Sequence, residues 1–330
     1  MRKTIFLSVL SLAFFAACEK DDDSGSGSGT PTTGNRYSEA IFESVNVTTV
    51  TYSDTFALDM DIYQGDGDSD NNRRVIVLAH GGSFYSGTKE NPTITYLAEE
   101  FAKMGYVAVS IDYRKENSIA NLLDSINAVG AVSRAVHDGK AAVRYLRKSA
   151  ASGNPFGIDD SKIMAGGNSA GGVLALHMAY MDDQSFLAPH IDSIITAEGG
   201  VEGNSGNAGY SSEITAILSL AGAIHRDYWV YNKGYTIVNA HGDMDGIVPF
   251  GCDDIYRGYY PQFELVQLCG SQAVQAQADN MGETSSTLVF PGADHVPWWE
   301  YDPAGGPGMP NAKMDSVMAF AIPKLKVALD

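Results

Sequence analysis

The sequence has 330 residues, of which 44% are hydrophobic and 19% are charged, and this composition supplies a large core and excludes an intrinsically disordered or fibrous protein. Forty acidic residues against 22 basic ones give a formal net charge of −18, which repels the phosphate backbone of nucleic acids and anionic lipid surfaces. Three cysteines are too few for a disulfide scaffold or a four-cysteine zinc site.

The first 17 residues have the pattern of a signal peptide. Arg2 and Lys3 precede an apolar run at residues 5–17, which is shorter than the roughly 20 residues that a membrane-spanning helix needs. The run ends in small residues before Cys18, and this junction resembles the lipobox of bacterial lipoproteins. The resemblance implies that Cys18 becomes the lipidated N-terminus. A simple secretory signal that leaves Cys18 as a free thiol is the alternative.

Residues 18–36 have the composition of a flexible, solvated tether. An acidic stretch at residues 19–23 is followed by Ser-Gly repeats, which do not form a packed core. The acidic stretch is similar to the surface-export signal of Bacteroidota lipoproteins. This resemblance implies an exported protein that is anchored in the outer membrane by its lipid alone and is exposed at the cell surface.

One folded domain is expected at residues 37–330, where short β-rich runs alternate with amphipathic stretches. This alternation predicts an α/β fold whose sheet is mostly parallel and has helices on both faces. The first two predicted strands have no helix between them, which indicates an antiparallel edge. Eight strands are predicted, at residues 46–52, 57–63, 74–79, 106–112, 162–166, 215–219, 236–240 and 287–290. Helices are predicted at residues 92–103, 138–149, 170–181, 271–281 and 313–329.

Asp66, Asp68 and Asp70 alternate as the first ligands of a calcium loop do. The remaining positions do not fit, because Asn71 stands where an EF-hand needs glycine and Val77 where it needs a bidentate glutamate. The segment is therefore predicted to be a turn between strands, and no metal site is expected there.

The segment Gly167-Asn168-Ser169-Ala170-Gly171 fits the pattern G-x-S-x-G between a predicted strand and a predicted helix. A serine on so sharp a turn needs neighbours without bulk, and Gly167 and Gly171 meet this requirement. The start of the helix then directs unpaired N–H groups at the reacting centre. A phosphate-binding loop is the alternative, but Ser169 replaces the second glycine of G-x-G-x-x-G and no G-K-[ST] is present.

The segment His80-Gly81-Gly82-Ser83 follows the third predicted strand. An acyl-transfer enzyme needs backbone N–H donors facing the nucleophile, and glycines let the main chain approach an oxyanion closely. With this loop and the serine turn, the chain resembles α/β-hydrolase fold carboxylesterases of the hormone-sensitive-lipase and feruloyl-esterase kind. The resemblance implies that the N–H groups of Gly82, Ser83 and Ala170 form the oxyanion hole. Ser83 stands where the fuller family motif has a third glycine.

The acid and the histidine of this fold follow the serine along the chain, each after a later strand. Residues 241–249 resemble the family pattern His-Gly-x-x-Asp-x-x-Val-Pro, which implies that Asp245 is the acid. Asp243, on the same loop, is the alternative. Of the seven histidines only His295 lies beyond this acid, just after the last predicted strand, so it is predicted to be the base. The other six are expected to be structural or surface residues.

A triad of Ser169, Asp245 and His295 predicts a carboxylic ester hydrolase that forms an acyl-enzyme and needs no metal or organic cofactor. The expected substrates are short-to-medium acyl or aryl esters, either small molecules or esters linked to polysaccharide. A serine peptidase of the same fold and a non-catalytic binding lipoprotein are the alternatives. Five aromatic residues near the triad would form either a wall for aryl or sugar rings or ordinary core: Phe84, Tyr85, Trp298, Trp299 and Tyr301.

Cys252 and Cys269 lie between the predicted acid and the predicted base. In an exported protein we expect them to pair, which would stabilise the fold by about 3 kcal/mol through loop-closure entropy. Two unpaired buried thiols are the alternative.

Overall fold

The computed structural model describes residues 36–183, 185, 187–262, 265–304 and 306–330. The predicted signal peptide, Cys18 and the predicted tether up to residue 35 lie outside the described residues. Within the described ranges, no helix has both the length and the apolar composition that a membrane span requires.

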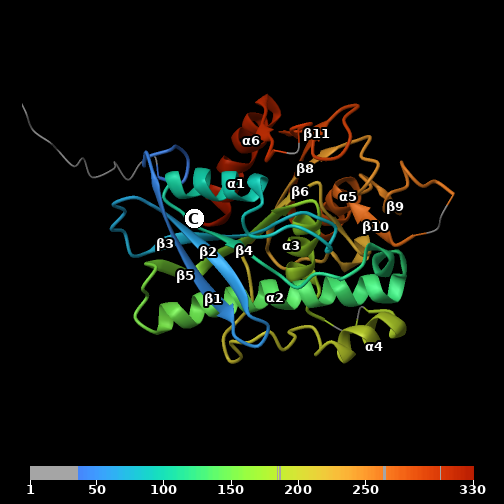
Figure 1. Cartoon of the computed structure of the whole chain (residues 1–330), viewed down its shortest axis with the longest axis horizontal. Coiled ribbons are helices and arrows are strands. Elements are labelled where there is room, and N and C mark those ends of the chain that lie inside the picture. The colour runs from blue at the N-terminus through green and yellow to red at the C-terminus, as the bar shows by residue number, and fades with distance from the viewer. Residues whose placement is uncertain (1–35, 184, 186, 263–264, 305) are drawn as a thin grey trace, which may run out of the picture. The chain divides into compact units, whose positions relative to one another are not determined.

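An eight-stranded sheet runs through the domain in the order β1-β2-β4-β3-β5-β6-β8-β11 (Figure 1). The strands β1 and β2, and also β2 and β4, pair antiparallel, whereas the other neighbours are parallel. The prediction of a mostly parallel sheet with an antiparallel edge is therefore confirmed. The strands are β1 (Val45–Ser53), β2 (Leu58–Gly65), β3 (Arg73–Ala79), β4 (Val107–Ile111), β5 (Ile158–Asn168), β6 (Ala216–Leu220), β8 (Thr236–Gly242) and β11 (Thr284–Phe290).

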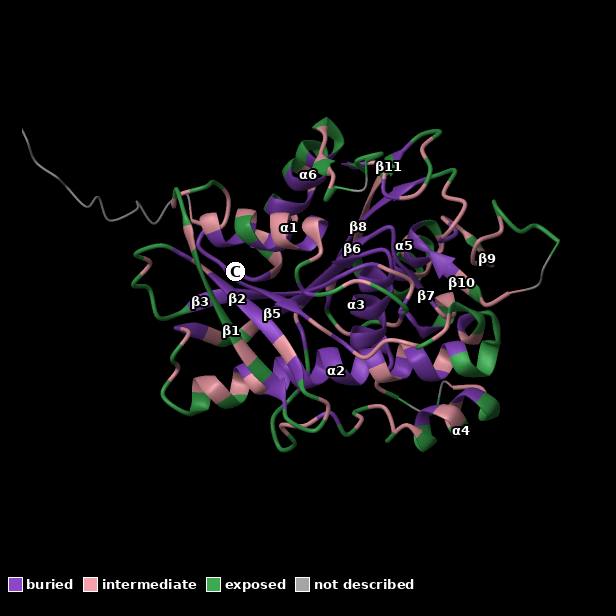
Figure 2. Ribbon diagram, in the orientation of Figure 1, coloured by how far each residue is buried: buried purple, intermediate pink, exposed green. Residues whose placement is uncertain are grey.

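Helices cover both faces of the sheet, and the central strands β3, β4 and β6 are wholly buried, whereas the edge strands β1 and β11 are partly exposed (Figure 2). In β3 the side chains alternate: Val75 and Val77 belong to the hydrophobic cluster of α2, α3 and α5, whereas Ile76 and Leu78 belong to that of α1 and α6. The helices are α1 (Pro92–Lys103), α2 (Ser125–Ala151), α3 (Ala170–Tyr180), α4 (Pro189–Ala197), α5 (Ser271–Met281) and α6 (Ala312–Ala328), with 3₁₀ turns η1 (Ile119–Leu123) and η3 (Asp227–Trp229).

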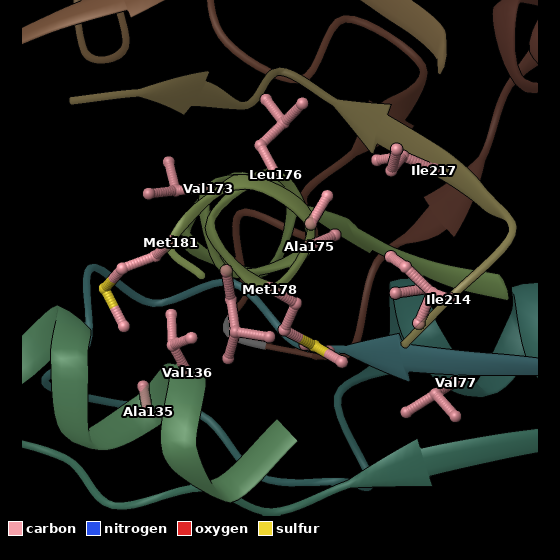
Figure 3. Packing of buried hydrophobic residues seen from close by; sticks show 14 of the residues in the cluster. Val77, Ala135, Val136, Val173, Ala175, Leu176, Met178, Met181, Ile214 and Ile217 are labelled. Atoms are coloured by element: carbon pink, nitrogen blue, oxygen red, sulfur yellow. The ribbon is translucent and has the colours of Figure 1, made fainter. Parts of the chain in front are cut away.

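Helix α3 lies at the centre of the larger hydrophobic cluster, and all of its residues are buried. Figure 3 shows Val173, Leu176 and Met178 pointing away from its axis in different directions, with Val136 of α2 beside it. A helix that is apolar all round is stable only when it is enclosed on every side. The position of its first residue is therefore fixed by packing along the whole helix.

Two helices differ from the prediction. Helix α2 begins at Ser125 rather than at residue 138, because the Asp124 side chain accepts hydrogen bonds from the N–H groups of Ile126 and Asn127. Gly130 and nearby serines weaken the apolar pattern in this first part, so periodicity alone does not reveal it. Helix α4 was not predicted.

Five short strands were also not predicted, since each has only two to four residues and shows no period. They form a three-stranded sheet in the order β7-β10-β9 and a separate pair, β12 and β13. Their bounds are β7 (Ala223–Ile224), β9 (Cys252–Asp254), β10 (Gln267–Gly270), β12 (Trp299–Glu300) and β13 (Met309–Pro310).

Asp66, Asp68 and Asp70 lie in the connection between β2 and β3, as the turn prediction requires. Asp68 forms ion pairs with Arg36 and Arg73. In the part of the chain that the structure describes, no group of three or more histidine, cysteine, aspartate or glutamate side chains is placed to hold a metal ion.

Candidate active site

Ser169 lies on the sharp turn between β5 and α3, with backbone angles φ 57° and ψ −120°. The conformation is strained for a residue with a side chain, and it requires close backbone contact on both sides. A Cβ atom on Gly171 would lie 1.9 Å from the Ala79 carbonyl oxygen, and one on Gly167 would lie 2.5 Å from the Gly171 oxygen. The two glycines flanking the serine therefore have the steric role inferred from the sequence.

The structure brings Ser169, His295 and Asp245 together, although they come from three separate loops. The Ser169 Oγ atom lies 2.9 Å from His295 Nε2, and His295 Nδ1 lies 2.7 Å from Asp245 Oδ2. With Nδ1–H donating to the carboxylate, Nε2 is free to accept the serine proton. This geometry is that of a serine nucleophile, its general base and the acid that orients the base.

The side chain of Asp245 is fully buried and accepts several hydrogen bonds. Its Oδ1 atom accepts from the N–H groups of Ile247 and Val248, each at 2.9 Å. Burial alone would raise the pKa of Asp245, but hydrogen bonds from His241 and His295 outweigh it and hold the pKa well below its usual range. The carboxylate is thus charged at any pH at which His295 could act as a base.

Asp243, the alternative acid, points elsewhere. Its Oδ1 atom accepts the N–H of Gly292, so its carboxylate stabilises the loop before His295 rather than the imidazole itself. Of the two carboxylates left open by the sequence, only Asp245 contacts His295.

His241, which was expected from the sequence to be a structural or surface residue, belongs to the site. Its Nε2 atom lies 3.2 Å from Asp245 Oδ2, and its Nδ1 atom lies 2.8 Å from the Ser271 hydroxyl. Both neighbours of Nε2, the Asp245 carboxylate and the Val248 carbonyl, are acceptors, so Nε2 carries the hydrogen. His241 therefore contacts the same carboxylate oxygen as His295 and helps to orient the acid. Its position four residues before Asp245 was the signal available in the sequence.

The loop after β3 approaches Ser169 with an unusual backbone. Gly82 has φ 117° and Ser83 has φ 55°, and a Cβ on Gly82 would lie 2.2 Å from the Ser86 carbonyl oxygen. Within the described ranges, no acceptor bonds the N–H groups of Gly82, Ser83 or Ala170. Ala170 is the first residue of α3, where the helix dipole favours negative charge. Three donors predicted for the oxyanion hole are thus available.

An apolar cavity of about 100 Å³ opens beside Ser169. Segments of η1, α2, α4 and the region between β9 and β10 form about half of its wall. Aliphatic side chains dominate it. The wall includes Ser83, Phe84, Leu122, Val129, Val173, Ile191, Ile195, Trp229, Ile255, Tyr256, Val266 and Leu268.

The aromatic wall considered for the substrate is present only in part. Phe84 lines the cavity, but Trp298 and Trp299 do not. Trp298 is fully buried and donates from Nε1 to Asn168 Oδ1 at 3.1 Å, which connects the histidine loop to the serine turn. Tyr301 is 69% exposed and also lies outside the lining. Core packing therefore explains both tryptophans.

Cys252 and Cys269 form a disulfide, as predicted for an exported chain. The bond joins β9 to β10, where the two cysteines are paired residues of the small sheet. The segment that it closes, residues 252–269, supplies Ile255, Tyr256 and Val266 to the cavity wall.

Residues 60–225 match the family model BD-FAE. The chain is similar to Thermogutta terrifontis esterase 2 phosphoramylated by tabun, with TM-score 0.59 and 21% identity over 85% of this chain and 94% of that one. The same esterase phosphorylated by paraoxon gives TM-score 0.57 and 22% identity over 83% and 91% of the two chains. The butyrate-bound Est2 of this organism gives 0.56 and 21% over 86% and 91%.

No curated protein sequence matches the chain. Because the identities to the solved structures are low, their likeness shows the fold. The predicted α/β-hydrolase fold is confirmed by these structures, and the predicted resemblance to feruloyl-esterase-like carboxylesterases is confirmed by the family match.

Proposed function

The chain belongs to the BD-FAE family, and from this premise we propose that it is a serine carboxylic ester hydrolase that works through an acyl-enzyme. The observation that carries the proposal is the hydrogen-bonded series Ser169–His295–Asp245 at the edge of an apolar cavity. A nucleophile, a base and an oriented acid beside unpaired N–H donors are the parts that acyl transfer needs.

The mechanism follows from these positions. His295 Nε2 takes the proton of Ser169 as Oγ attacks the ester carbonyl, and the N–H groups of Gly82, Ser83 and Ala170 stabilise the oxyanion. The protonated His295, held by Asp245, gives its proton to the leaving alcohol, which leaves an acyl group on Ser169. Water activated by the same histidine then attacks the acyl carbonyl and releases the acid.

The cavity supports esters with short-to-medium acyl groups or with aryl groups. Its wall is mainly aliphatic, so burial of methylene groups favours binding by about 0.8 kcal/mol each. The Thermogutta terrifontis esterase, which shares the fold, has been solved with butyrate bound. Esters attached to extracellular polysaccharide fit the proposed location, because we also propose that the chain is an outer-membrane lipoprotein anchored through Cys18.

Hydrolysis of p-nitrophenyl acetate, butyrate and octanoate by the whole chain tests the activity. We expect turnover that Ser169→Ala removes and that Ser316→Ala, at an exposed serine of α6, leaves intact. Methyl ferulate and acetylated xylan added to the panel rank aryl and polysaccharide esters. If the wild type turned over none of these esters but cleaved peptide p-nitroanilides, the chain would be a peptidase.

Labelling with radioactive palmitate tests the anchor. We expect incorporation into the wild type and recovery in the outer-membrane fraction, and neither for Cys18→Ser. An unlabelled, secreted wild type would instead support the simple secretory signal.

A further inference from the structure

The disulfide-closed segment, of which the structure describes residues 252–262 and 265–269, contacts the active site on two sides. The Tyr256 N–H donates to the Ile247 carbonyl at 2.7 Å, and the Gly258 N–H donates to the Gly246 carbonyl at 3.2 Å. These two bonds attach the segment to the loop that directly follows Asp245. On the other side, the Tyr256 hydroxyl lies 2.6 Å from the Ser83 hydroxyl. Tyr256 thus connects the loop that follows Asp245 to the loop after β3 that carries Gly82 and Ser83, which we call the oxyanion loop.

Ser83 is the point at which the oxyanion loop most needs support. Ser83 and Phe84 have φ values of 55° and 58°, and both follow Gly82 at 117°. Side chains disfavour this left-handed region, so the conformation persists only where several contacts hold it. The N–H groups of Tyr85 and Ser86 bond the Gly82 carbonyl, which fixes the turn but not the Ser83 side chain. Among the described residues, Tyr256 is the hydrogen-bond partner of that side chain.

Tyr256 is itself held firmly. Its backbone lies in the left-handed region at φ 57°, and its carbonyl accepts the N–H groups of Tyr259 and Tyr260. Cys252 and Cys269 join the two ends of the segment. A side chain anchored in this way transmits the position of the segment to whatever its hydroxyl bonds.

We propose that Tyr256 is a positioning residue that holds the Ser83 N–H in the direction of the oxyanion. The proposal rests on the ester hydrolase function above. The developing oxyanion is stabilised only if the donors already point at it. A loop that is free to relax at Ser83 therefore loses stabilisation of the transition state, while its binding of the substrate changes little. Loss of the tyrosine hydroxyl therefore lowers kcat and leaves KM nearly unchanged.

A double-mutant cycle tests this inference on p-nitrophenyl butyrate. Removing a whole oxyanion donor typically costs about 10² to 10³ in kcat, so a donor that is only misaligned in Tyr256→Phe should cost about tenfold. Ser83→Ala removes the same bond from the other side and should cost a similar factor. The double variant should lose no more than either single one, because the two changes remove one shared interaction. Tyr210→Phe, at an exposed tyrosine outside the cavity wall, is the matched control and should keep full activity.

A second readout separates positioning from simple packing. Butylboronic acid forms a tetrahedral adduct with an active serine, so its affinity should fall by the same factor as kcat in Tyr256→Phe. The affinity for butyrate, a planar product, should not change, and the melting temperature should stay close to that of the wild type. A KM increase at constant kcat, or additive losses in the double variant, would overturn the proposal. A wild type inactive on every ester would instead overturn the function on which it rests.

Discussion

The turn between β5 and α3 that carries Ser169 and the segments that enclose the cavity are stabilised by different kinds of contact. The serine turn is fixed by close contact between backbones, since a Cβ on Gly171 would lie only 1.9 Å from the Ala79 carbonyl oxygen, and by a helix that is buried along its whole length. The enclosing segments are partly exposed and are held by caps, hydrogen bonds and a disulfide. They are η1, the start of α2, α4, and the described residues 252–262 and 265–269. Packing therefore places the chemistry, whereas a smaller number of separate bonds shapes the substrate site.

The largest expected effect concerns the acid of the triad, on the loop that follows β8. Asp245→Asn should lower kcat by about 10⁴ while the protein stays folded, because an amide at this position favours the wrong tautomer of the histidine. Asp243→Asn, which lacks contact with His295, should change kcat far less. Steady-state kinetics of the two variants decide the matter. Equal losses would show that the acid function is shared by both carboxylates.

One substitution made in both regions sharpens the contrast in stability. Gly171→Ala places a methyl group against the Ala79 carbonyl and should cost about 3 kcal/mol or more of unfolding free energy, together with activity. Gly130→Ala, in the enclosing part of α2, meets only the ends of side chains, the nearest being the Arg134 and Glu198 side chains at 3.3 Å. It should change the unfolding free energy by less than about 1 kcal/mol, since alanine favours the helix. Urea denaturation measures both, and a stable, active Gly171→Ala would remove the distinction.

As the pH falls, the fold should lose stability before the Asp245 carboxylate of the triad becomes protonated. Burial lowers the pKa of His80, His137 and His177 to about 4 from the usual 6.5. These histidines therefore bind protons near pH 6.5 in the unfolded chain but only near pH 4 in the folded chain. Stability is full above pH 6.5 and falls between these limits by up to about 1.4 kcal/mol per pH unit for each histidine. Asp245, with its lowered pKa, adds its own loss only at more acidic pH.

The unfolding free energy measured by urea at pH 7, 6 and 5 checks this slope. His177→Gln should reduce the slope of unfolding free energy against pH by the contribution of about one proton. The reason is that His177 Nε2 accepts the backbone N–H of His225 and cannot be protonated without losing that bond. A stability that stays constant between pH 7 and pH 5 would contradict the expectation.

The smallest expected effect is a change of acyl preference in the enclosing region. Ile195 of α4 is buried in the cavity wall, so Ile195→Ala should raise the ratio of octanoate to acetate hydrolysis by about three- to tenfold. Ile217 of β6 is equally buried but does not line the cavity, and Ile217→Ala should lower stability without changing this ratio. Rates on the p-nitrophenyl series measure both. An unchanged ratio in Ile195→Ala would mean that α4 does not limit the acyl chain.

The same division explains what could be predicted from the sequence. The residues that meet at the triad follow motifs, because the turn at Ser169 and the loops after β8 and β11 demand particular residue types at fixed places. The strands of the main sheet were recognisable from their short β-rich runs. The cavity wall was not, because Ile191, Ile255 and Leu268 lie in short elements without periodicity, and their common surface exists only after folding. Tyr256 has no local signal, since its partner Ser83 lies 173 positions away in the chain.

The disulfide between Cys252 and Cys269 gives the place of synthesis a consequence for catalysis. A polypeptide produced where thiols stay reduced would have its serine turn, acid and base in place, but hydrogen bonds alone would hold one wall of its cavity and the partner of Ser83. A polypeptide produced where thiols oxidise would have the disulfide as well. The two forms differ by only two hydrogen atoms, and we expect them to differ in their selectivity among ester substrates.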